Sequence, residues 1–187
     1  MRTLTLTSVT KREFTDKNTK MTSADPGRVR DLWLRSGDLL VQRSNTAELV
    51  GTCALYAGPD DWAIFPDLLI RLRPDESKIL PGFLAAGLAS DRVHRELRGK
   101  AKGLAGSMPK IDQEAIGAQL VPCPDLKTQR RLLVTHDRLQ EGLARLLADV
   151  GLLRRNQAAL RRSLLSAAFS GRLTSIELEA EPTGIRT

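Results

Sequence analysis

The chain has 187 residues, which suits one ordinary domain with an appendage rather than two full domains. Its hydrophobic content of 41% supports a packed core and excludes wholesale disorder, while an aromatic content of 4% argues against base-stacking platforms. The net charge is +7, and the two cysteines, Cys53 and Cys123, have neither metal-ligand spacing nor the pattern of a disulfide framework.

The positive charge is concentrated in two regions of the chain. Between Arg92 and Lys110 six basic residues stand against one acid, and between Lys127 and Arg172 ten stand against three. Such regions are typical either of a polyanion-binding surface or of a solvated helix face, and charge alone favours neither. No apolar stretch is long enough to span a membrane and no N-terminal signal segment is present, so we expect a soluble, cytoplasmic protein without a membrane partner.

The N-terminal half of the chain is predicted to form strands separated by polar turns. Threonine and leucine alternate over 3–7, which is the period of a strand, and a polar stretch rich in turn residues follows over 10–30. Further strands are expected at 39–41, 51–56, Ile64 and 68–72.

The second half is predicted to be mainly helical. A helix is expected over 81–97 with a proline in its first turn, and a short helix over 112–120 with Asp112 as its cap. The glycine-containing segment 99–109 between them is predicted to be a loop. We place the boundary between the globular domain and the final helix at 124–127.

Leucine recurs at every seventh residue near the end of the chain, and a second series follows each leucine by four residues. This heptad pattern, sustained over five repeats, is typical of a long helix that pairs with another helix. A continuous helix over 128–169 would be roughly 60 Å long, more than a domain of this size can bury. The ten residues, which we call the seam, are Leu132, His136, Leu139, Leu143, Leu146, Val150, Leu153, Gln157, Leu160 and Leu164.

No catalytic, metal or cofactor site is indicated. His94 and His136 are the only histidines, and neither belongs to a metal-binding pair. His136 and Gln157 are polar residues within the seam, where such residues more often fix helix register than perform chemistry. We therefore expect a non-enzymatic protein that needs no cofactor and no metal.

Two polar segments are candidates for contact with DNA. The segment 42–45 carries side chains of the kinds that pair with adenine and guanine edges in the major groove. The segment 100–110 carries lysines, and its glycines permit close approach to a phosphate. The alternatives are a polar turn between two strands for the first segment and an exposed connection for the second. The candidate residues are Gln42, Arg43, Ser44, Asn45, Lys100, Lys102, Ser107 and Lys110.

Five short motifs follow one another along the chain. They are GDLLVQRSN at 37–45, VG at 50–51, AGSMPKI at 105–111, VPCPDLKTQ at 121–129 and AFSGRL at 168–173. In this order, with the heptad helix between the last two, they resemble the specificity subunit of type I restriction-modification systems. The resemblance covers the chain from about Thr3 to Leu173.

The resemblance implies an α+β fold in three parts. These are a globular mixed α/β DNA target recognition domain over 1–126, one long coiled-coil helix over 127–171 and a flexible tail over 172–187. In this family the recognition domain reads double-stranded DNA, methyltransferase (modification) subunits bind along the helices, and a restriction subunit cleaves unmethylated DNA. The specificity subunit itself is not catalytic.

A family member has two recognition domains and two antiparallel helices, so this chain resembles half a subunit. Pairing through the seam with a second recognition domain, in a homodimer or with another specificity chain, is therefore expected. The chain also begins close to its first strand, which predicts a recognition domain that lacks its N-terminal portion. The alternative is a truncated remnant that acts only as a coiled-coil interaction protein, binding methyltransferase or other specificity subunits.

Overall fold

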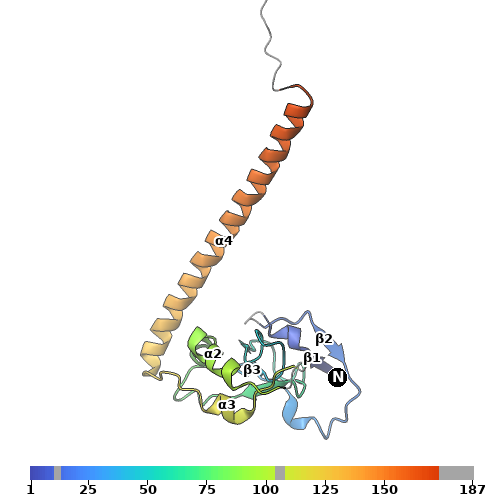
Figure 1. Cartoon of the computed structure of the whole chain (residues 1–187). Coiled ribbons are helices and arrows are strands. Elements are labelled where there is room, and N and C mark those ends of the chain that lie inside the picture. The colour runs from blue at the N-terminus through green and yellow to red at the C-terminus, as the bar shows by residue number, and fades with distance from the viewer. Residues whose placement is uncertain (11–13, 104–107, 173–187) are drawn as a thin grey trace, which may run out of the picture. The chain divides into compact units, whose positions relative to one another are not determined.

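The computed structural model describes residues 1–10, 14–103 and 108–172. The chain divides into two compact units, Met1–Thr135 and a second that begins at His136. Within the described residues, the first unit combines two small antiparallel sheets with short helices and the start of a long helix, α4 (Leu126–Phe169) (Figure 1). The α+β class predicted from the sequence is confirmed.

A three-stranded antiparallel sheet forms the centre of the first unit. Its strand order is β4 (Cys53–Leu55), β3 (Leu39–Gln42), β5 (Leu69–Leu72). The middle strand is buried at every position because it has a partner on each side and a core on each face. The buried apolar run predicted these strands correctly, although β4 is shorter than the range expected.

The two-stranded sheet pairs β1 (Arg2–Leu4) with β2 (Thr19–Met21). The first strand is shorter than predicted because the chain turns into a 3₁₀ helix, η1 (Leu6–Ser8). The prediction of a polar loop is wrong at β2, which has no alternating apolar pattern to reveal it. A second 3₁₀ helix, η2 (Arg30–Leu32), follows, and Ile64 forms only isolated bridges rather than a strand.

Two helices, α1 (Pro81–Leu88) and α2 (Asp91–Lys100), replace the single helix predicted over 81–97. The break lies at Ser90, whose hydroxyl accepts a hydrogen bond from the Val93 N–H at 3.4 Å and caps α2. Because the apolar spacing continues across the break, the sequence pattern alone did not show it.

The short helix α3 (Gln113–Gly117) begins where the sequence predicts. The Asp112 carboxylate accepts a hydrogen bond from the Ala115 N–H at 2.7 Å, which confirms its capping role. The helix is shorter than expected at its C-terminal end.

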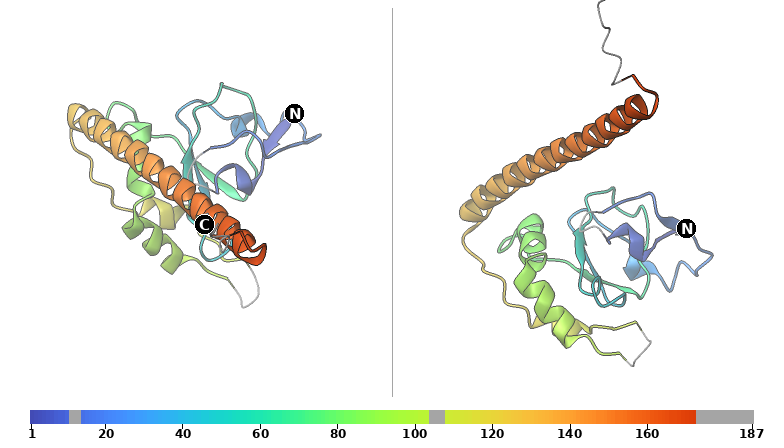
Figure 2. Two further views of the ribbon diagram at one scale, coloured as in Figure 1. Left: turned by 90° about the horizontal axis from the view of Figure 1, so that it is seen from above. Right: turned by 45° about the horizontal axis from the view of Figure 1, so that its top comes forward.

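Side chains from β3 enter two different cores because successive strand residues point to opposite faces. Leu39 and Val41 pack with residues of α1, α2 and α3. Leu40 packs on the other face, in a cluster that contains Leu4 of β1 and Tyr56, the residue after β4. Figure 2 shows α1 and α2 on one side of the sheet and the N-terminal elements on the other. The central sheet thus holds the two halves of the first unit together.

A buried carboxylate fixes the turn that precedes β3. Asp38 is 1% exposed, and its oxygens accept hydrogen bonds from Arg73 Nε at 2.6 Å and from the Arg35 backbone N–H at 2.8 Å. The hydrogen bond to Asp38 raises the pKa of Arg73, so the guanidinium stays charged. This pair connects the start of β3 to the end of β5.

Replacing Asp38 by alanine is expected to lower the free energy of unfolding by about 3 kcal/mol, because the Arg35 amide and the Arg73 guanidinium lose their acceptor. Urea denaturation measures the change. The control is Asp16→Ala at an exposed position, expected within about 0.5 kcal/mol of the unchanged chain. Equal losses in the two variants would contradict the structural role of the Asp38 pair.

The long helix α4 has 44 residues, about 66 Å at the usual rise. Asp125 caps its start, accepting hydrogen bonds from the Thr128 N–H at 3.0 Å and the Thr128 hydroxyl at 2.7 Å, and these bonds lower the pKa of Asp125. Gly171, at a φ of 72°, ends the helix; its N–H bonds the Ala168 carbonyl while the Arg172 N–H bonds the Ala167 carbonyl. Within the described ranges, no helix is both long and apolar enough to cross a membrane.

Candidate nucleic-acid interface and helical seam

The two segments predicted to contact DNA lie side by side in the first unit. Lys102 and Lys110 exchange two backbone hydrogen bonds of 2.9 and 2.8 Å, and Lys110 also forms an antiparallel bridge with Ser44. The Ile111 N–H donates to the Arg43 carbonyl at 2.9 Å. The segment predicted as a simple loop is therefore closed at its base and attached to the end of β3.

Four basic side chains are exposed along this arrangement, and we call them the basic edge. They are Arg43, Lys100, Lys102 and Lys110. Among the residues that the structure describes, no acid forms an ion pair with any of the four. Exposed lysine and arginine side chains attract phosphate, so these four are candidates for contact with the DNA backbone.

Gln42 and Ser44 lie inside the domain, and this corrects the expectation that their side chains contact DNA. Gln42 is 0% exposed; its amide nitrogen donates to the Leu6 carbonyl at 3.0 Å and Thr10 Oγ1 at 3.2 Å, and its oxygen accepts from Asn45 Nδ2 at 2.6 Å. Ser44 is 1% exposed. Gln42 instead ties β3 to the N-terminal segment, as its place at the end of a buried apolar run could have indicated.

Two further residues, Asn45 and Ser107, were predicted to contact DNA. Asn45 is half-buried, and its side-chain oxygen accepts a hydrogen bond from the Thr46 N–H at 2.8 Å in addition to the bond with Gln42. Ser107 lies outside the described residues, as does the part of the predicted flexible tail from 173 onward. The accessible part of the predicted set is therefore basic.

A buried glutamine that the sequence reasoning missed fixes the start of α4. Gln129 is 0% exposed; its amide nitrogen donates to the carbonyls of Lys78 at 2.9 Å and Pro124 at 2.7 Å, and its oxygen accepts from the Leu80 N–H at 2.8 Å. These bonds hold the first turn of α4 against the segment that precedes α1. The start of α4 belongs to the first compact unit, which ends at Thr135.

The apolar residues of the seam are solvent-exposed along α4. The eight apolar members are between 44% and 69% exposed, with Leu132 and Val150 at the lower end and Leu139 at the upper end. Of its two polar members, His136 has local partners, with Nδ1 lying 3.2 Å from Asp137 Oδ1. An exposed apolar face of this length marks an interaction surface, and its pairing with another helix remains a prediction.

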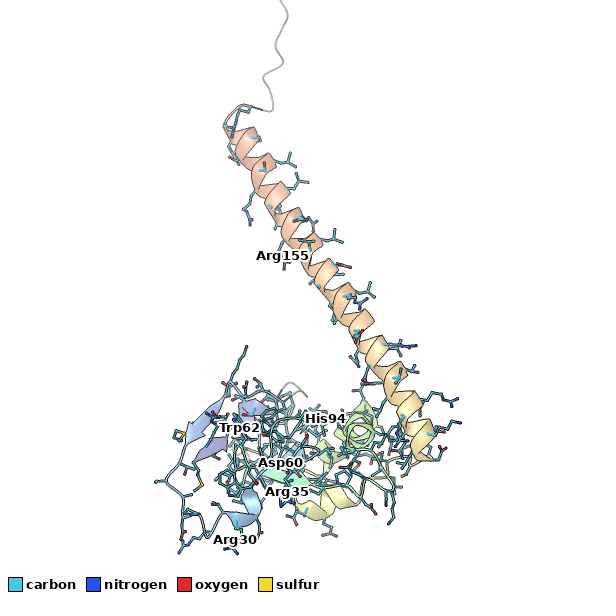
Figure 3. The ribbon with its side chains drawn as sticks, turned by 180° about the vertical axis from the view of Figure 1, so that it is seen from behind. Arg30, Arg35, Asp60, Trp62, His94 and Arg155 are labelled. Carbon is cyan, nitrogen blue, oxygen red and sulfur yellow. The ribbon has the colours of Figure 1, made fainter. Side chains whose placement is uncertain are left out.

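Arginines accompany the seam on the rest of the helix. Arg154, Arg155, Arg161 and Arg162 are exposed, and Figure 3 shows the Arg155 side chain extending from α4. Among the described residues after Val150, the helix carries no acid. The second unit therefore offers an apolar face flanked by positive charge.

No protein-family model and no curated protein matches the chain. Solved structures do match it. The crystal structure of the HsdS subunit from Thermoanaerobacter tengcongensis superposes with a TM-score of 0.64 at 21% sequence identity, covering 99% of this chain and 46% of that one. The chain has the HsdS fold.

A second match comes from a study of complex assembly and conformational transition in the type I R-M system. Its TM-score is 0.59 at 17% identity, and it covers 100% of this chain and 45% of that one. The chain thus spans about half the length of each of these two solved structures. The structural resemblance predicted from the ordered motifs is confirmed, from the first strand to the long helix.

Proposed function

We propose that this chain acts as the specificity subunit, or as half of one, of a type I restriction-modification complex. It is a non-catalytic, cytoplasmic protein that recognises double-stranded DNA and directs methyltransferase and restriction subunits to a bipartite site. The observation that carries the proposal is the fold match over the whole chain to about half of HsdS. The basic edge supports it, because two segments distant in sequence are joined by backbone bridges and both carry exposed basic side chains.

Each part of the chain has a proposed task. The first unit reads one half of the site, with Lys100, Lys102 and Lys110 on phosphates and Arg43 on a base edge. The seam pairs with the helix of a second recognition domain, from a copy of this chain or from another specificity chain, and sets the distance between the half-sites. A symmetric homodimer reads a palindromic split site.

The experiment is selection from a randomised duplex library by the full-length chain, alone and with the modification methyltransferase subunit of the same organism. Enrichment of a bipartite sequence is the expected result. Association with the methyltransferase without any sequence preference would favour the alternative, a remnant that acts only as a coiled-coil interaction protein. Absence of both DNA selection and methyltransferase association would contradict both functions.

Replacing Lys100, Lys102 and Lys110 together by alanine is expected to weaken binding to all DNA sequences. Each lost phosphate contact lowers the slope of log affinity against log salt concentration by about 0.9, so the triple variant should lose close to 3 from that slope. Fluorescence anisotropy over a salt series measures it.

A matched control for the triple variant removes the same charge from other exposed lysines. It carries Lys17→Ala, Lys20→Ala and Lys127→Ala. The salt slope of this control should remain close to that of the unchanged chain. An unaltered slope in the Lys100, Lys102 and Lys110 variant would remove the basic edge from the interface.

A further inference from the structure

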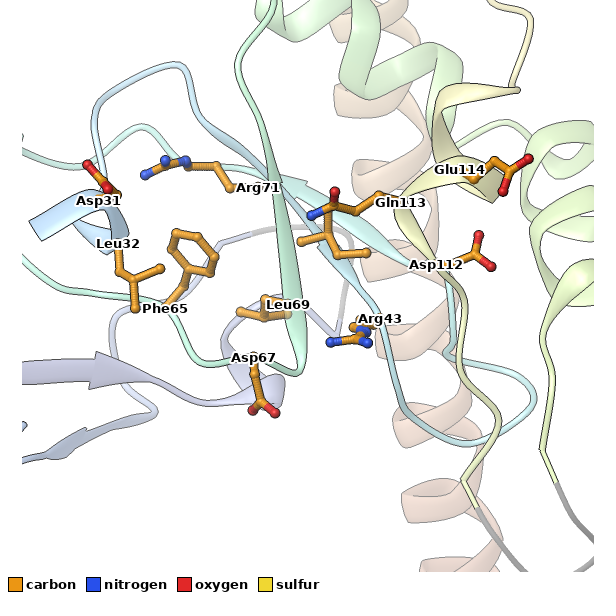
Figure 4. Close-up of a pocket in the computed structure, with 11 residues that line it drawn as sticks. Asp31, Leu32, Arg43, Phe65, Asp67, Leu69, Arg71, Asp112, Gln113 and Glu114 are labelled. Carbon is orange, nitrogen blue, oxygen red and sulfur yellow. The ribbon is translucent and has the colours of Figure 1, made fainter. Parts of the chain in front are cut away.

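A groove of about 720 Å³ lies beside the basic edge and shares Arg43 with it (Figure 4). The polar residues that line this groove differ in charge from those of the basic edge. Besides Arg43 and Arg71 it contains a glutamine, Gln113, and four acids that include Asp67 and Glu114. Carboxylates in excess over arginines repel phosphate, so this lining suits the donors and acceptors of base edges rather than the DNA backbone.

Arg43 lines the groove, and its backbone is held by hydrogen bonds from both sides. Its N–H donates to the Leu68 carbonyl at 2.9 Å, and its carbonyl accepts from the Ile111 N–H at 2.9 Å. Asp67 precedes the first of these partners, and Gln113 lies two residues after the second. The chain therefore places a carboxylate, a guanidinium and an amide on three adjacent segments.

Some of the polar groups in the groove already have structural tasks. Arg71 donates to the Trp33 carbonyl at 3.0 Å and lies over the Phe65 ring, with its guanidinium carbon 5.1 Å from the ring centroid. Burial lowers the pKa of Arg71, as expected for a guanidinium held inside the fold. Asp112 is occupied as the cap of α3. These groups already have partners in the fold and help to shape the groove.

Of the five remaining polar groups of the groove, three lie on the adjacent segments just described. The side chains of Asp67, Arg43 and Gln113 are exposed, and within the described part of the chain they form no hydrogen bond or ion pair. An exposed polar group without a partner in the fold keeps its donors and acceptors accessible to a ligand, and ordering each such side chain on binding costs about 0.5–1.5 kcal/mol.

We propose that Asp67, Arg43 and Gln113 form a reading row for DNA base edges, in which Asp67 and Gln113 determine specificity. The inference rests on the proposed function and assigns residues to it. Arg43 donates to guanine O6 and N7 while Asp67 accepts from cytosine N4, so the two together complement a G·C pair. Gln113 complements the N6 and N7 groups of an adenine. The half-site therefore contains a G·C pair and an A·T pair read from this groove.

The test is selection from a randomised duplex library by the full-length chain with its methyltransferase subunit, repeated with Asp67→Asn and Gln113→Ala. Each variant should lose about 10-fold of discrimination at one base pair and keep the salt slope of the unchanged chain, because neither residue contacts a phosphate. Gln113→Glu should move the preference at its position from adenine toward cytosine, since a carboxylate only accepts. Asp16→Asn, at an exposed position outside the groove, should leave the profile unchanged.

The outcomes separate the reading row from the function on which it rests. Unaltered base preferences in Asp67→Asn, Gln113→Ala and Gln113→Glu, with a selective unchanged chain, would overturn the reading row and leave DNA recognition standing. An unchanged chain without any base preference would overturn both. Unfolding midpoints are measured for every variant, and Gln113→Glu, which gains a preference rather than losing one, cannot be mimicked by loss of folding.

Discussion

Replacing Gln129 by leucine is expected to lower the free energy of unfolding of the first compact unit by about 4 kcal/mol. Leucine has a similar volume but leaves the Leu80 N–H and the carbonyls of Lys78 and Pro124 without their partner. A buried polar group that loses its hydrogen bond costs about 1–3 kcal/mol, and three such groups lie around this side chain. The loss is a large fraction of the stability of an ordinary domain.

The effect is measured by urea denaturation followed through the near-ultraviolet signal of Trp33 and Trp62, which both lie in the first unit. The matched control is Gln140→Leu, the same substitution at an exposed position of α4, expected to change stability by less than about 0.5 kcal/mol. If both glutamine variants unfolded at the same urea concentration as the unchanged chain, Gln129 would not anchor α4.

Local patterns were enough to predict much of this fold. The apolar run at Leu39 predicted β3, Asp112 predicted the start of α3, and the heptads predicted α4. Each is a signal carried by neighbouring residues. The break at Ser90 was missed because the apolar spacing of one helix continues into the next, and β2 was missed because its stabilising partner lies in a distant segment.

The candidate site was harder to predict, because it depends on contacts between segments. Residue types in 42–45 indicated DNA contact, but the direction of each side chain depends on what covers β3, so Gln42 proved buried and Arg43 exposed. The pairing of Lys110 with Lys102 and Ser44 has no local signature. Gln129 has no local signature either, because the Lys78 and Leu80 backbone groups that it bonds lie in a segment distant in sequence.

Two glutamates on the seam, Leu146→Glu with Leu153→Glu, are expected to abolish helix pairing. The two leucines are 64% and 67% exposed in the single chain, so most of their apolar surface is available to a partner. Burial of a leucine contributes about 1.5–3 kcal/mol, and a homodimer loses four of them, which totals at least about 6 kcal/mol. That loss weakens self-association by roughly 10⁴-fold or more, before the cost of burying charge is counted.

Sedimentation velocity measures the association, with Ala144→Glu plus Ala148→Glu as a control of equal charge. Ala148 lies half a turn from the seam, so its substitution changes the helix charge without touching the pairing face. The seam variant should sediment as a single chain and still bind one half-site, because the first unit is unchanged, but it should lose selectivity for the spacing between half-sites. Loss of association in the control but not in the seam variant would place the contact on the opposite face of α4. Persistent spacing selectivity in a single chain would mean that something other than helix pairing sets the distance.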